Sequence, residues 1–254
     1  MQVVTLSDCE ILMAPSVYYP QAYHISGIER ALALGKDRLK VHTPKPEAFE
    51  RFSLGSPSSQ IKAAAILYND LVYETELKVL RPNSSPYQAV IKDNLGAPYK
   101  LQQVQDCYNK ILSSLNQIHA ALESHKAEAL AVNRVLRNLR FQFLQKTFYS
   151  IRDAIDCLTQ PPRRTVDEHM TNPSRKCFHP PIPKDIVLSF FFRGPVLVFA
   201  SYALGYNGRD KRWEIIGRTT VNCLVPRLED VLRYLNLALD RTTHLLHRLE
   251  VPNN

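Results

Sequence analysis

The residues whose types and spacing could support chemistry are few and scattered along the 254-residue chain. His244 and His247 stand three apart, which places both imidazoles on one side of a helix where they could share a metal ion. Since no cysteine stands at ligand spacing beside them, we interpret the pair as part of a solvated helix face.

The other groups of potentially reactive or metal-binding residues have simpler structural interpretations. Cys177-Phe178-His179 lies in a proline-rich stretch without a second ligand pair, so we interpret it as structural. Glu229 and Asp230 lie near the start of the last predicted helix, and we interpret them as favourable helix-dipole charges rather than as a catalytic dyad. The five cysteines form no CxxC pair, which predicts neither a disulfide nor zinc.

Phosphate-binding loops are missing from the sequence. The eight glycines form neither GxGxxG nor GxxxxGK, so a nucleotide cradle is not expected. We therefore predict no catalytic residue, no cofactor and no bound metal, and a protein that is not an enzyme.

The net charge of +8 allows an anionic partner such as nucleic acid, a lipid surface or an acidic protein. The basic residues considered are Arg134, Arg137, Arg140, Arg152, Arg163, Arg164, Arg175 and Lys176. They do not share one helical face and are not interleaved with aromatic residues, so we interpret them as a solvated face and a basic loop. A basic nucleic-acid-binding protein is kept as an alternative.

The elements that organise the chain are helices with heptad seams. Tyr99 to Ser124 predicts one such helix, and residues 128–158 predict a second that could lie back along it. Pro226 opens a third at its first helical position. The predicted seam residues are Leu101, Val104, Tyr108, Ile111, Leu115, Ile118, Leu122, Leu228, Leu232, Leu235, Leu239, Leu246 and Leu249. We expect Leu232, Leu235 and Leu239 to pack against the first helix.

Two regions carry strand patterns. Alternating apolar residues at 61–67, 71–79 and 87–91 predict an antiparallel meander, with turns at Asn69-Asp70 and at 81–84. After the helix pair, 185–192 and 196–204 predict a buried hairpin around Arg193-Gly194, and 213–221 a further strand.

This order predicts an α+β fold, with an antiparallel helical bundle at one end, a mostly antiparallel β-sheet domain at the other, and both discontinuous in sequence. The predicted segments are a poorly defined N-terminal stretch (1–46), a first β part (47–98), a helix pair (99–160), an exposed loop (161–183), a second β part (184–222) and a C-terminal helix (223–250). A short, poor helix with Gly35 inside is the most that 25–39 suggests. No apolar run is long enough to span a bilayer and no signal peptide opens the chain, so we expect a cytoplasmic protein.

Several blocks resemble one family, the Rogdi leucine-zipper-containing proteins. They are PEAFERFSLGS, IKAAAILYNDLVYETELKVL, YKLQQVQDCYNKI, PPIPKDIVLSFFFRGPVLVFASYAL and VNCLVPRLEDVL, in matching order and spacing over about residues 47 to 249. The resemblance implies an elongated protein with a helical bundle and a β-sheet domain, without catalytic residues.

The resemblance also implies a function. Proteins similar to Rogdi are the small non-catalytic subunit of RAVE-type complexes, which act with a large rabconnectin-like β-propeller scaffold to promote assembly of the vacuolar proton-pumping ATPase. The implied partners are that scaffold and, through the complex, the peripheral sector of the pump, with no nucleic acid and only indirect membrane association. The implied location is cytoplasmic and peripheral to endomembranes, with the nuclear envelope as a second location.

Two further expectations remain open. A self-associating leucine-zipper scaffold is an alternative to the adaptor, because its seams would pair with a second copy. Residues 1–46 do not resemble the acidic amphipathic helix expected before the first strand of the family, so we expect that helix to be missing and the natural start to lie upstream of Met1.

Overall fold

The computed structural model describes residues 20–39, 50–56, 58–81, 84–91, 98–130, 134–161 and 163–250. They fall into two compact units. The helical unit draws on Met1–Arg38, Tyr108–Ile155 and Asp230–Asn254, and the β unit on Leu39–Cys107 and Asp156–Glu229. Both units are therefore discontinuous in sequence and the fold is α+β, as predicted.

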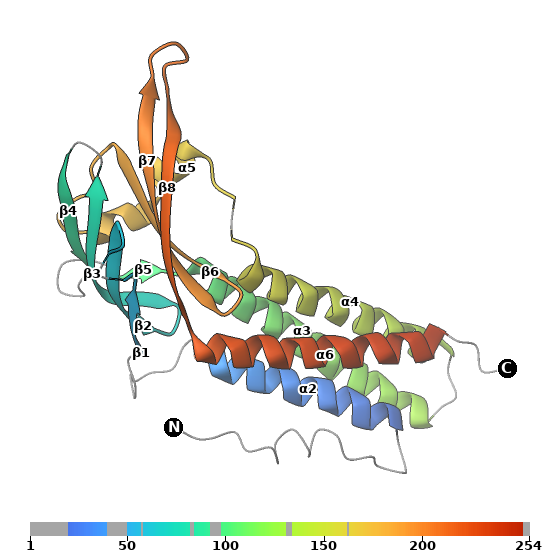
Figure 1. Ribbon diagram of the computed structural model, residues 1–254. Helices are drawn as coiled ribbons and strands as arrows, with labels where there is room; N and C mark the ends of the chain where they lie inside the picture. Colours follow the sequence, from blue (N-terminus) through green and yellow to red (C-terminus); the bar gives the residue numbers. More distant parts are fainter. Residues whose placement is uncertain are drawn as a thin grey trace. The chain divides into compact units, whose positions relative to one another are not determined.

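The helical unit consists of most of four helices that lie alongside one another (Figure 1). They are α2 (Pro20–Leu39), α3 (Gln102–Leu130), α4 (Arg134–Thr159) and α6 (Pro226–Glu250). Lys110 of α3 lies 2.7 Å from Asp153 of α4, and His119 of α3 lies 2.8 Å from Glu29 of α2. Pro226 is the first residue of α6, as predicted.

The helix α2 corrects the prediction for the N-terminal segment. Instead of a short, poor helix it has 20 residues, and Ile25, Ile28 and Leu32 on one face are completely or almost completely buried. Gly27 is also buried, and an added Cβ there would collide with the guanidinium of Arg241 in α6. Packing of this buried face thus overrides the low intrinsic helix propensity of the glycines. Residues 1–19 and 40–49 lie outside the described residues.

The start of α3 also differs from the prediction. Tyr99–Lys100 is a short strand, β5, instead of the first helical residues, and it pairs with β3 through Val72 and Leu71. Leu101 follows β5 and precedes the helix, with its backbone N–H donating to the carbonyl of Asp70 at 2.7 Å. Strand pairing therefore uses backbone groups that a helix beginning at Tyr99 would need.

The predicted meander is confirmed as an antiparallel sheet in the order β1-β2-β3-β4. Its strands are β1 (Glu50–Leu54), β2 (Ile61–Tyr68), β3 (Leu71–Arg81) and β4 (Ser84–Ile91). Asn69 adopts a φ of 54°, the left-handed conformation that a two-residue hairpin turn favours and asparagine tolerates. Two of the four residues of the second predicted turn, 82 and 83, lie outside the described residues.

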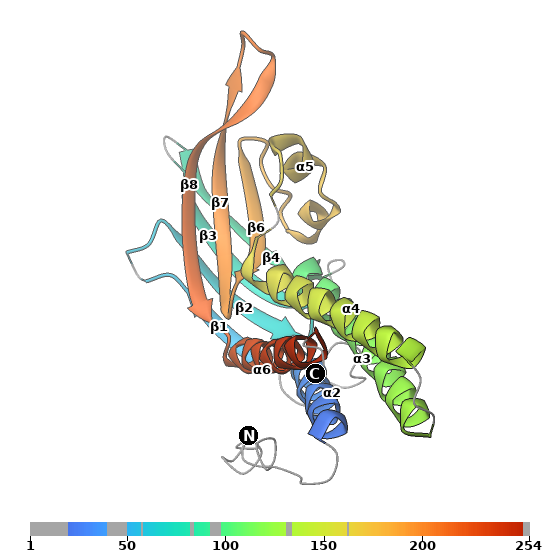
Figure 2. The ribbon, with the colours of Figure 1, turned by 90° about the vertical axis from the view of Figure 1, so that its right-hand side faces the viewer.

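The second predicted group of strands is confirmed as a separate sheet, β6-β7-β8. Its strands are β6 (Ile186–Arg193), β7 (Val196–Asn207) and β8 (Arg212–Leu224), and Gly194 makes the first turn with a φ of 65°. The two sheets lie against each other (Figure 2), with the Thr219 and Gln60 side chains 3.2 Å apart. The far end of the β7–β8 hairpin extends beyond the other strands of the unit (Figure 1).

The segment 161–183 is not simply the exposed loop that was predicted. It contains α5 (Val166–Thr171), which is opened by a capping box between Thr165 and Glu168, and the 3₁₀ helix η2 (Pro173–Cys177). Cys177, Phe178 and Ile182 are buried. Apolar side chains within the proline-rich stretch thus help to cover the β unit, and the prolines shape turns without excluding burial.

Arg175 fixes this segment. Its guanidinium donates to the carbonyl oxygens of Ile182, Pro183 and Ile186 at 3.2 to 3.3 Å.

No described helix is both long and apolar enough to span a bilayer.

Candidate functional site

The predicted seam residues are largely covered within a single chain. Eight are buried: Leu101, Val104, Ile111, Leu115, Ile118, Leu228, Leu235 and Leu249. Five are partly exposed: Tyr108, Leu122, Leu232, Leu239 and Leu246. On α6 the buried stripe also includes Val231, Ala238 and Leu245, so it is wider than a two-position zipper seam and resembles the face of a bundle helix. The direct pairing of Leu232, Leu235 and Leu239 with α3 stays a prediction.

The residues considered for metal binding or catalysis are not assembled into a site. His244 lies edge-on to His24 of α2, with ring centroids 5.9 Å apart, and the part of the chain that the structure describes holds no cluster of three metal-ligating side chains. Asp230 lies 3.0 Å from Arg233, one turn along α6. His179 pairs through its backbone with Val90 of β4.

The thiols of Cys107, Cys177 and Cys223 are not poised as nucleophiles. Burial raises the pKa of Cys107 and of Cys177, and it raises the pKa of Cys223 to about 11. These side chains stay protonated at neutral pH, and the thiol form is a poor nucleophile.

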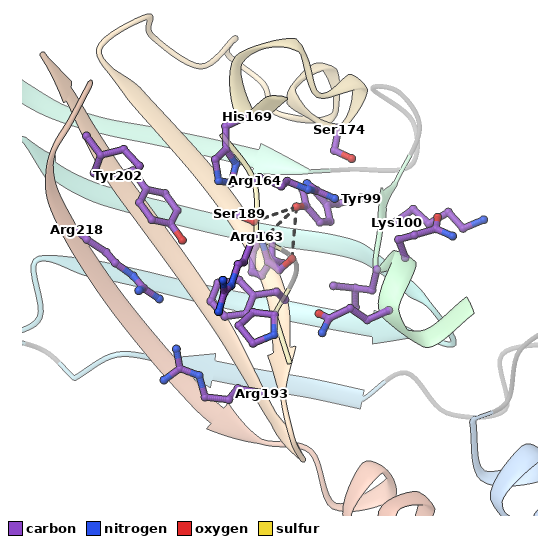
Figure 3. A pocket seen from close by; sticks show the side chains of 17 residues that line it. Tyr99, Lys100, Arg163, Arg164, His169, Ser174, Ser189, Arg193, Tyr202 and Arg218 are labelled. Carbon is purple, nitrogen blue, oxygen red and sulfur yellow. Dashed lines mark hydrogen bonds between the residues drawn. The ribbon is translucent and has the colours of Figure 1, made fainter. Parts of the chain in front are cut away.

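A basic pocket is the most distinctive site of the β unit. It has a volume of about 310 Å³ and lies on one face of the β6-β7-β8 sheet (Figure 3). The cationic residues that line it are Lys100 from β5, Arg163 and Arg164 from the segment after α4, Arg193 from β6 and Arg218 from β8. We call these five residues the pocket cations.

No aspartate or glutamate is among the 17 lining residues. Arg163, Arg193 and Arg218 are exposed, and none of the pocket cations forms an ion pair with a described carboxylate. Glu168 interacts electrostatically with Arg164 but does not line the pocket. Like charges gathered in one hollow raise the local positive potential. The pocket therefore attracts anions.

Hydrogen bonds hold the inner wall of the pocket in place. The Tyr99 hydroxyl accepts from the backbone N–H of Phe190 at 3.3 Å and lies 3.5 Å from the Ser189 hydroxyl. The amide of Gln103 accepts from the N–H of Phe192 at 2.7 Å and donates to its carbonyl at 3.1 Å. These buried bonds join β5 and the first turn of α3 to β6, so the cations around the mouth project from a rigid frame.

His169 and Tyr202 form the outer wall. Their rings lie 5.3 Å apart, and the Arg218 guanidinium lies 5.6 Å from the centroid of the Tyr202 ring. Burial lowers the pKa of His169, and the positive charge of Arg164 lowers it further. His169 is thus neutral at pH 7, and its imidazole has no hydrogen bond to a hydroxyl of the pocket.

The pocket can bind but has no acid–base machinery. General acid–base or nucleophilic catalysis requires a base in hydrogen-bond reach of a nucleophile, and neither a carboxylate nor such a histidine pair lines the pocket. The sequence singled out Arg163 and Arg164 as part of a basic loop. It missed Lys100, Arg193 and Arg218, because single cations on three separate strands carry no local signal.

Comparison with known proteins places the chain in a family. The family model described as "Rogdi leucine zipper containing protein" matches residues 5–250. The chain belongs to the Rogdi family. The Rogdi match covers residues 5–46 and so includes α2, and the expectation that this segment departs from the family is wrong. The missing first helix and the natural start upstream of Met1 stay predictions.

Three Rogdi relatives illustrate the extent of the similarity. Protein rogdi of Drosophila melanogaster is 26% identical over 65% of this chain, and the homolog of Caenorhabditis elegans is 26% identical over 80%. The human Rogdi homolog is 24% identical over 82% of this chain. The matches span 59% of the fly protein, 70% of the nematode protein and 79% of the human protein. None of these three names denotes an enzyme.

Proposed function

We propose that the protein is a non-catalytic adaptor subunit of a RAVE/rabconnectin-type complex that promotes assembly of the vacuolar proton-pumping ATPase, and so organelle acidification. The observation that carries this proposal is the Rogdi family match over residues 5–250. The partners would be a rabconnectin-like β-propeller scaffold and, through the complex, the peripheral sector of the pump. The protein would act in the cytoplasm at endomembranes, with the nuclear envelope as a further location.

The chemistry of the described residues supports a role through contacts alone. The described cysteines whose pKa values burial raises stay protonated, and His244 meets another histidine instead of a ligand set. The basic pocket holds charge without a catalytic base. A binding subunit needs none of these groups to react.

Burial in a single chain argues against the self-associating zipper. Ile111, Ile118 and Leu235 are completely buried before any second copy is added. A zipper built from the same seams would first have to open the helical unit and expose these side chains, at a cost of about 1.5–3 kcal/mol for each. Other residues of the same chain therefore already cover these seam side chains.

The test is made in cells that lack the protein. After a stress that separates the two sectors of the pump, reassociation should be slow and vacuoles or lysosomes should acidify poorly. Co-precipitation of the peripheral sector with the membrane sector measures the first effect, and a ratiometric pH dye measures the second. Re-expression of the 254-residue chain should restore both. Normal reassembly in a clean deletion would rule the assignment out.

A second measurement tests the partner. The chain tagged at its C-terminus should bring down a large β-propeller protein in stoichiometric amount. A pure chain that sediments as a homodimer and brings down no such protein would favour the zipper scaffold instead.

A further inference from the structure

The pocket cations are not accounted for by folding or by the adaptor role. Some arginines of the β unit are held by hydrogen bonds within the chain, for example Arg175, which donates to three carbonyls. The five pocket cations line one hollow (Figure 3), and none of them forms an ion pair with a described carboxylate. Holding them together costs electrostatic free energy, which a bound anion would offset.

We propose that this pocket is a binding site for a compact, non-aromatic ligand that carries several phosphate groups, of the phosphorylated-inositol type. The site does not depend on the adaptor role, because it is argued from the β unit alone. The same headgroup occurs free in solution and on a membrane lipid, and both present the same chemistry to the pocket.

The side chains favour phosphate over other anions. Four of the five pocket cations are arginines, whose planar guanidinium donates two parallel hydrogen bonds to phosphate oxygens. Ser174 and Tyr202 add hydroxyls to the lining. Five positive charges exceed what a single phosphate, with a charge between −1.5 and −2 at neutral pH, neutralises. The charge therefore matches a ligand with more than one phosphate.

The volume favours a compact ligand. At about 310 Å³ the pocket is at the lower end of the range of about 300–1,000 Å³ seen for small-molecule sites. A substituted six-membered ring with its phosphates at the rim would place the ring in the hollow and the charges toward the cations around it.

The aromatic rings of the pocket argue against nucleotides and nucleic acid strands. Tyr99 is 4% exposed and lies against Phe178 and Phe190. Tyr202 contacts His169 on one side and carries the Arg218 guanidinium. Single-strand binding relies on open aromatic faces on which bases stack, and these rings are already in contact with protein groups.

The direct test measures the affinity of the full chain for inositol hexakisphosphate by isothermal titration calorimetry at physiological salt. We expect saturable binding of one ligand for each chain, no binding of unphosphorylated myo-inositol, and weaker binding of ATP. The double variant Arg163→Gln/Arg164→Gln should lose about tenfold or more in affinity for each arginine removed.

A matched control separates the pocket from net charge. Arg152 on α4 and Arg209 in the β7–β8 turn are exposed and outside the pocket. The double variant Arg152→Gln/Arg209→Gln removes the same formal charge, and its affinity should change by less than about twofold because neither side chain lines the pocket and exposed charges are screened by salt. An equal loss in both double variants, or no binding by the wild-type chain, would overturn the proposal.

Vesicles distinguish the two sources of the headgroup. Phosphatidylcholine vesicles that contain phosphatidylinositol bisphosphate are compared with vesicles in which phosphatidylserine supplies the same total charge. Preferential flotation with the first vesicles, lost in the pocket variant, supports a lipid headgroup as the source. Binding of inositol hexakisphosphate without vesicle binding supports a soluble ligand. Equal flotation with both vesicles, or tighter binding of single-stranded RNA than of inositol hexakisphosphate, would contradict the proposed ligand class.

Discussion

Arg227 and the basic pocket lie in the same β unit, yet their guanidinium groups have opposite surroundings. Arg227, in the first turn of α6, is 8% exposed. It donates to the backbone oxygens of Leu39 at 3.2 Å and Asn69 at 2.6 Å, and its Nε lies 3.0 Å from a carboxylate oxygen of Glu50. Burial lowers the pKa of Arg227, while the Glu50 charge acts in the opposite direction.

The pocket cations show the reverse pattern. Arg163 and Arg193 are exposed and have no carboxylate partner among the described residues. The β unit thus surrounds the buried Arg227 with oxygen atoms and leaves Arg163 and Arg193 open to solvent. The difference teaches that the first kind of arginine serves stability and that the second is available to a ligand.

The largest effect should come from Arg227→Met. It leaves two backbone carbonyls and the Glu50 carboxylate without their partner, and removing one member of a buried charge pair costs about 3–5 kcal/mol. Urea unfolding of the full chain measures the loss. The control is Arg193→Met in the pocket, which should change the free energy of unfolding by less than about 0.5 kcal/mol. Equal losses in the two variants would remove the distinction between the two kinds of arginine.

Truncation of a buried apolar side chain in the helical unit gives a second loss in the free energy of unfolding for comparison. Leu235 on α6 is completely buried, so Leu235→Ala should cost about 2–5 kcal/mol. The matched control is Leu112→Ala on α3, where the side chain is 36% exposed and the loss should be much smaller. A loss below about 0.5 kcal/mol for Leu235→Ala would place this leucine outside the core and revive the zipper alternative.

Two exposed cations should respond with opposite signs. Lys110 lies 2.7 Å from Asp153 and is 44% exposed, so Lys110→Gln should lose about 0.2–1 kcal/mol of stability. Arg163→Gln removes like-charge repulsion in the pocket, so the free energy of unfolding should stay the same or rise slightly. Thermal unfolding of both variants in one buffer makes the comparison, and added salt should shrink the difference. Destabilisation by Arg163→Gln to the same extent as by Lys110→Gln would show that folding uses the pocket charge.

Acidification should produce the smallest effect. Burial lowers the pKa of His169, which Arg164 lowers further, and burial also lowers the pKa of His24, with Arg248 as the next cause. Below their ordinary value of 6.5 the unfolded chain therefore binds more protons than the folded chain. The contribution of these two histidines to the free energy of unfolding is fully present above pH 6.5 and is lost as the pH falls below it. Urea midpoints across this window should fall less for His169→Gln than for the wild type, and identical pH profiles would contradict the assignment.

The sequence predicted elements whose signal is local. The alternating apolar residues of β2 and β3 and the turn at Asn69 predict a hairpin from neighbouring residues alone. The apolar seams of α3 and α6 predict helices in the same way. The helix α2 was underestimated because Gly35 lowers the intrinsic helix propensity, whereas burial of Ile25, Ile28 and Leu32 stabilises the helix through packing. Leu101 was placed on a helix because its spacing fits the seam, whereas the neighbouring strand β3 takes the preceding residues as β5.

The basic pocket could be predicted only in part. Arg163 and Arg164 are adjacent and visible as a basic dipeptide. Lys100, Arg193 and Arg218 reach the same hollow only because β5 pairs with β3 and because β6 and β8 flank β7. Such a site is a product of topology, and no pattern within one segment reveals it.

One measurement tests most directly the claim that the pocket arginines are reserved for a ligand. Urea unfolding is followed for the wild type and for Arg163→Gln/Arg164→Gln, each with and without inositol hexakisphosphate. Without ligand the two chains should have free energies of unfolding within about 0.5 kcal/mol of each other. Ligand at a hundred times its dissociation constant should stabilise the wild type by about 2.7 kcal/mol and the variant far less. A variant that is much less stable without ligand, or that gains as much from the ligand as the wild type, would contradict the claim.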